Sequence, residues 1–254
     1  MLDFNSTAYA DSELSLSINK LIEEAARIVA DPPRDYLGPS GVGHVCARRI
    51  QFDWQCEPEH AVRLRDIFAR GHFHERQARA HLRRAKFRFA PRRRLGTALG
   101  GLFRGNADGV LLGGPKSCDF KFPALWEHKA LNAKGWRSVN KHGLKDYPQY
   151  FAQIALYQEY LELTDHPALF TVTNADTCER LHLLVPFNIE LAQQSSDRAV
   201  MIIEATRAGE LLPRFTDNKQ DWRCTVCEHY DRCWEWPEHS SQPSSTNSVS
   251  CFVS

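Results

Sequence analysis

Two carboxylates in apolar surroundings are well suited to bind a metal ion such as Mg²⁺, and a lysine accompanies them. Glu127 and Lys129 lie two positions apart in the run ALWEHKAL (124–131), and side chains alternate across a strand, so both point to one face. Asp108 opens a second apolar run. Two carboxylates on adjacent strands repel unless a cation lies between them, and Mg²⁺ prefers such oxygens. The set predicts a site where Mg²⁺ polarises a phosphodiester and Lys129 positions the attacking water. A surface ion pair of Glu127 with Lys129 is the alternative.

A third carboxylate, Glu75, belongs to a long helical pattern. Leu64, Phe68, Gly71, Glu75, Ala78 and Leu82 recur at spacings of three and four, which predicts one inward stripe. Glu75 would then face the interior as a further metal ligand, and Gly71 would let another element approach closely. His74 lies at the edge of the stripe and is a competing ligand. The alternative is that Glu75 simply pairs with an arginine.

Gln153 and Tyr157 are four residues apart and therefore share one face of the next predicted helix. An amide and a phenol on one face can bind a phosphate or a base near the metal. Amphipathic packing is the alternative.

Three of the eight cysteines follow the pattern Cys224-x2-Cys227-x5-Cys233, and Cys46 is the best candidate for a fourth ligand. Such grouping indicates a metal site before disulfides. The spacing fits either an iron–sulfur cluster or a zinc ion completed by His229 or Cys46. The other four, which we expect to be ordinary residues, are Cys56, Cys118, Cys178 and Cys251.

Basic residues gather in one segment although the whole chain carries a net charge of only +1. Residues 63–94 hold twelve Arg or Lys against two acidic residues, a local net charge of +10. Arginine, which dominates here, suits phosphate oxygens. A solvated helix face is the alternative. The arginines expected to bind DNA are Arg83, Arg84, Arg92, Arg93 and Arg94.

We find no signal peptide and no apolar run long enough to span a bilayer, so we expect a cytoplasmic protein.

Hydrophobic periodicity predicts alternating helices and strands. We expect a first helix, capped by Asp11 or Ser12, that runs to about Ala30. The other predicted helices cover about 59–84, 148–163 and 188–209, and the strands lie near 86–90, 106–112, 123–130, 168–173 and 180–186. The Ser-rich stretch 238–254 is expected to be a disordered tail.

In this order, the motifs GxxxE (71–75), GxxD (105–108), ExK (127–129) and QxxxY (153–157) resemble the PD-(D/E)XK nuclease superfamily in its RecB-like branch. The resemblance covers about residues 40–235. It implies that Asp108, Glu127 and the backbone carbonyl of His128 bind Mg²⁺ or Mn²⁺, and that Lys129 is catalytic. Gln153 and Tyr157 would help to bind DNA and orient the site. Many members carry His at the end of the first motif, where this sequence has Glu75.

The cysteine pattern also resembles that of the Cas4 and AddB-type iron–sulfur nucleases. The resemblance implies a [4Fe–4S] cluster that joins Cys46 to the C-terminal group and has a structural role. The resemblance to the PD-(D/E)XK superfamily implies an α/β fold with a restriction-endonuclease-like αβββαβ core, a central mixed sheet flanked by helices.

Together these patterns predict a Mg²⁺- or Mn²⁺-dependent DNA nuclease, specifically an exonuclease, that acts in recombination, repair, CRISPR adaptation or phage DNA processing. Expected partners are DNA and a helicase, a recombinase or CRISPR adaptation proteins. The alternatives are a non-catalytic DNA-binding or adaptor subunit that keeps the fold, and a protein with a structural zinc site that acts on RNA. The expected divisions are an N-terminal helical segment (1–37), the nuclease domain (38–237) and the tail (238–254).

Overall fold

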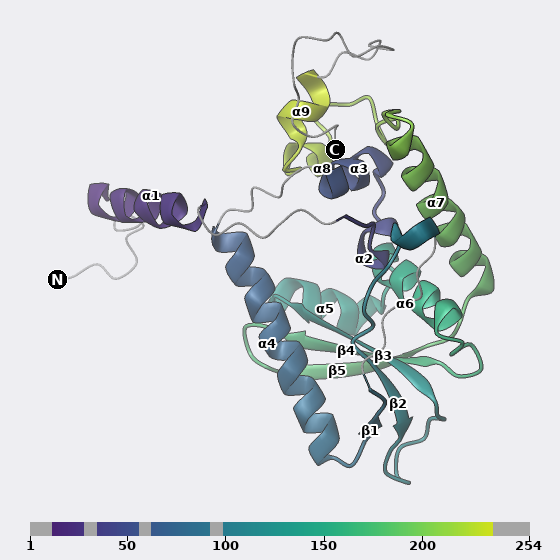
Figure 1. Ribbon diagram of the computed structural model, residues 1–254. Coiled ribbons are helices and arrows are strands. Elements are labelled where there is room, and N and C mark those ends of the chain that lie inside the picture. The colour runs from purple at the N-terminus through teal and green to yellow at the C-terminus, as the bar shows by residue number, and fades with distance from the viewer. Residues whose placement is uncertain (1–11, 28–34, 56–61, 92–98, 236–254) are drawn as a thin grey trace, which may run out of the picture.

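A five-stranded mixed sheet forms the centre of the molecule (Figure 1). The computed structural model describes residues 12–27, 35–55, 62–91 and 99–235. The strands follow one another in the order β1-β2-β3-β4-β5, and only β3 and β4 run parallel. Their bounds are Arg88–Phe89 (β1), Gly109–Gly113 (β2), Ala124–Leu131 (β3), Ala168–Asn174 (β4) and Arg180–Val185 (β5).

Each face of the sheet is covered by different helices. Leu125 on β3 and Phe170 on β4 belong to the larger core, together with apolar residues of α6 (Pro148–Tyr160) and α7 (Ile189–Arg207). On the other face, Trp126 packs with Ala78 of α4 (Val62–Arg84). Because side chains alternate along β3, Glu127 and Lys129 share the face of Leu125 and lie beneath α6.

Local sequence explains where several helices begin. Pro148 occupies the first turn of α6, where its missing N–H would have no helical partner. The side chain of Asn188 caps α7 by accepting a hydrogen bond from the Leu191 amide at 2.9 Å. The remaining helices are α1 (Glu13–Arg27), α2 (Pro39–Val42), α3 (Ala47–Gln55), the 3₁₀ turn η2 (Leu99–Gly101), α5 (Ala133–His142), α8 (Trp222–Thr225) and α9 (Tyr230–Glu235).

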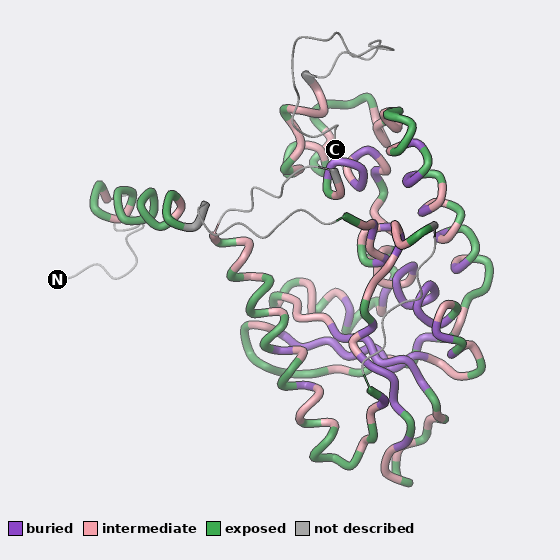
Figure 2. Tube along the Cα trace, in the orientation of Figure 1, coloured by how far each residue is buried: buried purple, intermediate pink, exposed green. Residues whose placement is uncertain are grey.

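The first predicted helix is present as α1, and Ser12 caps it by accepting a hydrogen bond from the Ser15 amide at 3.2 Å. The helix projects away from the sheet (Figure 1), and most of its described surface is exposed (Figure 2). Its apolar residues, such as Leu14 and Leu21, are exposed as well. The predicted end at Ala30 and the predicted tail lie outside the described residues.

The inward stripe predicted for α4 is only partly correct. Ala78 is buried as expected, but Phe68 is 51% exposed and a side chain at Gly71 would meet no neighbour. The close approach predicted at Gly71 is therefore wrong. Only the C-terminal half of α4 lies over the sheet (Figure 1), so a stripe drawn along the whole helix overstated the buried part. No helix in the described ranges has the length and apolar character that crossing a membrane requires.

Candidate active site

Glu127 is the centre of a buried polar cluster. Its side chain is completely inaccessible to solvent. One carboxylate oxygen, Oε1, accepts a hydrogen bond from the Asp108 amide at 3.3 Å, and the other, Oε2, accepts one from Gln153 Nε2 at 3.2 Å. The ammonium of Lys129 lies 3.7 Å from Oε2. The structure therefore brings together four residues that the sequence placed in three separate motifs.

The charge on Glu127 is poorly compensated by the protein alone. Burial raises the pKa of its carboxyl group well above the ordinary value, and the neighbouring carboxylate of Asp108 raises it further. Lys129 opposes this shift. Burial also works against the charge of Lys129, but the carboxylates of Glu127 and Asp108 outweigh it, so the pKa of Lys129 lies above its ordinary value. A divalent cation next to Asp108 and Glu127 would supply the missing positive charge.

Asp108 is held by contacts to its backbone and its side chain. Its Oδ2 accepts a hydrogen bond from the His128 amide at 2.8 Å, which ties the residue before β2 to the middle of β3. Its carbonyl oxygen accepts a hydrogen bond from Arg79 at 2.5 Å. Asp108 therefore lies beside Glu127 in a defined orientation. The metal binding expected for this pair stays a prediction. Arg79 was not among the residues that the motifs identified.

Gln153 and Tyr157 support the carboxylates from α6. Gln153 is buried and contacts Glu127 directly, whereas the Tyr157 hydroxyl donates a hydrogen bond to the Asn106 carbonyl at 2.9 Å. A β-carbon at Gly105 would lie 2.9 Å from the Tyr157 hydroxyl oxygen, so only glycine fits there. Burial, and then the charge of Glu127, raises the pKa of Tyr157, which stays protonated as a donor. The role in DNA binding expected for these two residues stays a prediction.

Glu75 and His74 lie on different sides of the site. Glu75 is half-buried, and its charge acts on both Glu127 and Lys129. Its carboxylate lies 3.7 Å from His72 Nδ1. His74 is the more buried of the two, and it acts electrostatically on His128, whose side chain lies on the opposite face of β3. The geometry thus favours Glu75 over His74 as a neighbour of the carboxylates.

His128 separates Glu127 from Lys129 and points to the α4 side of the sheet. Its Nε2 shares a hydrogen bond of 2.8 Å with Thr173 Oγ1 on β4. Burial, followed by the charge of Lys129, lowers the pKa of His128 to about 3, so the ring is neutral. The metal contact expected for the His128 carbonyl stays a prediction.

An aromatic pair flanks the lysine. The Lys129 ammonium lies 5.5 Å from the centre of the Tyr150 ring, and Tyr150 stacks on Tyr147 with ring centres 5.2 Å apart and planes inclined by 6°. Tyr150 lies three residues before Gln153, and this spacing in the sequence places both on the same face of α6.

The predicted DNA-binding arginines are only partly described. Arg83 and Arg84 are exposed in the last turn of α4. The other three, at 92–94, lie outside the described residues.

The four cysteines of the predicted cluster line a single cavity. Cys46 precedes α3, while Cys224, Cys227 and Cys233 lie in and between α8 and α9. The chain therefore brings thiols about 180 residues apart in sequence to one place. No group of three or more His, Cys, Asp or Glu side chains within the described ranges could hold a metal ion as placed in the structure.

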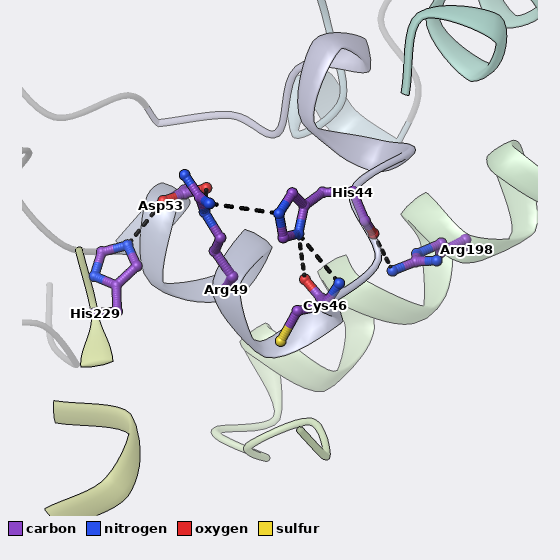
Figure 3. A network of polar contacts seen from close by, with 6 residues as sticks. All are labelled: His44, Cys46, Arg49, Asp53, Arg198 and His229. Carbon is purple, nitrogen blue, oxygen red and sulfur yellow. Dashed lines mark hydrogen bonds and ion pairs between the residues drawn. The ribbon is translucent and has the colours of Figure 1, made fainter. Parts of the chain in front are cut away.

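Polar contacts join α3 and the residues before it to His229, which lies between α8 and α9 (Figure 3). His229 Nε2 lies 2.7 Å from an oxygen of Asp53 on α3, and Arg49 lies between Asp53 and His44. His44 Nδ1 in turn accepts a hydrogen bond from the Cys46 amide at 3.1 Å. His229, the alternative zinc ligand, is therefore engaged with Asp53 while it lines the cavity.

Comparison with one solved structure supports the fold. An alkaline exonuclease from Laribacter hongkongensis superposes with a TM-score of 0.51 and 16% sequence identity, covering 74% of this chain and 93% of that protein. The protein SSO0001 gives a TM-score of 0.46 at 11% identity, covering 87% of this chain and 96% of that one. No protein-family model and no curated protein matches the sequence. The chain thus shares the fold of an exonuclease, an α/β architecture with a five-stranded mixed sheet flanked by helices.

Proposed function

We propose that this protein is a Mg²⁺- or Mn²⁺-dependent DNA nuclease, and specifically an exonuclease. The observation that carries the proposal is the completely buried Glu127, which lies beside Asp108 and 3.7 Å from Lys129. Buried carboxylates whose pKa is raised by desolvation and a neighbouring charge are characteristic of functional sites. The fold shared with an alkaline exonuclease supports the same reading.

The donor set fits Mg²⁺ or Mn²⁺. Magnesium is usually bound through one or two carboxylates, with water and substrate phosphate completing its shell, and Asp108 and Glu127 provide two. Glu75 and the carbonyl of His128 are the further ligands we propose, and His74 is the less favoured one. When bound, the metal would polarise the phosphodiester and make a coordinated water more acidic.

The protein residues have separate tasks in this proposal. Gln153 keeps Glu127 Oε2 oriented, and Tyr157 fixes the loop before Asp108 through the Asn106 carbonyl. Lys129 remains protonated and can donate a hydrogen bond to the attacking water or to a phosphate oxygen as negative charge develops. Arg83 and Arg84, with the arginines at 92–94, would bind the DNA backbone, where each contact contributes a salt-dependent attraction.

We further propose a [4Fe–4S] cluster ligated by Cys46, Cys224, Cys227 and Cys233. Four thiols around one cavity match the four cysteines that hold such a cluster. Its role would be structural, because the cavity lies between α3, α8 and α9 rather than at the carboxylates. A zinc ion at the same residues is the alternative, and the iron and zinc content of anaerobically purified protein decides between them.

Cleavage of end-labelled single- and double-stranded DNA with Mg²⁺ or Mn²⁺ tests the nuclease proposal. We expect Lys129→Ala to abolish cleavage, and Lys145→Ala, an exposed lysine elsewhere on the chain, to leave it unchanged. Products shortened one nucleotide at a time would identify an exonuclease. If Lys129→Ala cuts as fast as the wild type, the assigned site is wrong. DNA binding that persists in EDTA, together with no cleavage when Mg²⁺ or Mn²⁺ is present, would instead indicate a non-catalytic subunit, acting with a helicase, a recombinase or CRISPR adaptation proteins.

A further inference from the structure

Arg79 connects the basic helix α4 to the loop that carries Asp108. Its guanidinium donates a hydrogen bond of 2.5 Å to the Asp108 carbonyl oxygen. It also lies over the ring of Phe89 on β1, 4.5 Å from the ring centre. One side chain of α4 thus reaches across β1 to the residue that precedes β2.

The ring beneath Arg79 is itself fixed in place. Phe89 packs edge-to-face on Trp126, with ring centres 5.3 Å apart and planes inclined by 79°. A β-carbon at Gly109 would lie 2.8 Å from the Phe89 ring, so the ring rests directly on the backbone of the residue after Asp108. A cation over an aromatic face is attracted to it, and this contact orients the guanidinium toward the Asp108 carbonyl.

Asp108 is held from three directions. Glu127 accepts a hydrogen bond from its amide, the amide of His128 donates to its carboxylate, and Arg79 donates to its carbonyl. The first two contacts come from β3, which carries the rest of the candidate metal site. Arg79 supplies the contact from α4. It fixes the backbone of Asp108 and, through it, the position of the Asp108 carboxylate.

We propose that Arg79 is a positioning residue that holds Asp108 in the orientation needed for metal binding. This inference rests on the proposed function, because it assigns Asp108 as a metal ligand. Partners that orient a metal ligand typically change metal affinity about 10- to 100-fold when they are replaced. Arg79 thereby differs from the arginines proposed to bind DNA, although it lies on the same helix.

Arg83 provides the matched control for this difference. It lies one turn further along α4, is exposed, and also approaches the Phe89 ring, at 5.7 Å from its centre. A loss of positive charge near the site is therefore common to Arg79→Met and Arg83→Met. Only the first removes the hydrogen bond to the Asp108 carbonyl that the structure describes.

Mn²⁺ binding without DNA measures the effect directly. Electron paramagnetic resonance detects the free hydrated Mn²⁺ ion, so a titration gives the dissociation constant of Mn²⁺ from the purified protein. An Asp108→Asn/Glu127→Gln variant reveals any Mn²⁺ bound elsewhere on the chain. We expect Arg79→Met to weaken Mn²⁺ binding about tenfold, and Arg83→Met to keep wild-type Mn²⁺ affinity while weakening DNA binding. Unchanged Mn²⁺ affinity in Arg79→Met, or an equal loss in both variants, overturns the inference.

Two further variants keep the test decisive if Arg79→Met unfolds. Arg79→Lys retains a positive charge and a donor, so we expect a smaller loss of Mn²⁺ affinity. Phe89→Leu removes the ring that orients the guanidinium, and we expect it to weaken Mn²⁺ binding more than Arg79→Lys does. Wild-type affinity in both would overturn the positioning role. A wild-type protein with no Mn²⁺ site at Asp108 and Glu127 would refute the proposed function itself, and the inference with it.

Discussion

Replacing Glu127 by glutamine should make the metal-free protein more stable while it removes activity. The carboxylate is completely buried, and its raised pKa means that the folded protein disfavours the ionised form. Glutamine has the same shape but no charge. Its carbonyl oxygen can still accept the hydrogen bond from the Asp108 amide, and the Gln153 amide can turn to present its oxygen to the new NH₂ group.

Two opposing energies set the size of this gain. Burying a carboxylate costs several kcal/mol even after relaxation. Attraction to an ammonium about 4 Å away offsets about 4 kcal/mol of this cost at the effective dielectric constant typical of proteins. The Lys129 nitrogen lies 3.7 Å from Oε2 of Glu127. The raised pKa of Glu127 indicates that burial and the charge of Asp108 outweigh the attraction of Lys129, so we expect Glu127→Gln to have the higher free energy of unfolding. Each kcal/mol gained would raise Tm by about 2–4 °C in a domain of this size.

The pH dependence of unfolding in EDTA separates this mechanism from a general effect of the substitution. A carboxyl group with a raised pKa binds its proton more tightly in the folded state, so wild-type stability falls as the pH rises from the ordinary value of 4.5 through the raised pKa of Glu127. Below pH 4.5 the two proteins should differ little, and above the raised pKa Glu127→Gln should have the higher Tm. Glu159→Gln, on the exposed side of α6, should leave Tm nearly unchanged. A lower Tm for Glu127→Gln at pH 8 would refute the reasoning.

Three other changes test separate parts of the structure. Tyr157→Phe loses the hydrogen bond to the Asn106 carbonyl, so we expect thermal unfolding to show a loss of about 1 kcal/mol and cleavage assays a lower rate. Arg83→Ala with Arg84→Ala should reduce the slope of log DNA affinity against log salt by about one for each lost phosphate contact, as fluorescence anisotropy can measure; an unchanged slope would place the DNA elsewhere. Gln51→Leu should lower the free energy of unfolding by about 1–3 kcal/mol, because its buried amide bonds three groups near α7; equal stability would show that these bonds do not hold α3.

The strands were predictable because their local sequence agrees with their environment. The apolar run around Glu127 became β3, and the runs near 168–173 and 180–186 became β4 and β5 within one or two residues. Alternation along β3 also placed Glu127 and Lys129 on one face, as observed. These features depend on neighbours in sequence, so periodicity identifies them.

Features that depend on tertiary contacts were not predictable in the same way. Arg79 reads in sequence as one more arginine of a basic segment, and only the packing of α4 on β1 distinguishes it from Arg83. His74 is buried although the helical stripe placed it at an edge. Phe68 is exposed although the same stripe placed it inside. In both cases the orientation of α4 over the sheet overrides a pattern drawn from an isolated helix.

Consecutive residues of β3 carry buried polar groups on opposite faces of the sheet. Glu127 is hydrogen-bonded from α6, and His128 from β4. A buried polar group without its partner would cost about 1–3 kcal/mol or more, so β3 is favourable at the centre of the sheet only when α6 and β4 are in place. The hydrogen bonds of Glu127 and His128 therefore form only together with the whole core. Glutamine at position 127 keeps this hydrogen-bonding capacity without the buried charge, which is why Glu127→Gln should stabilise the fold.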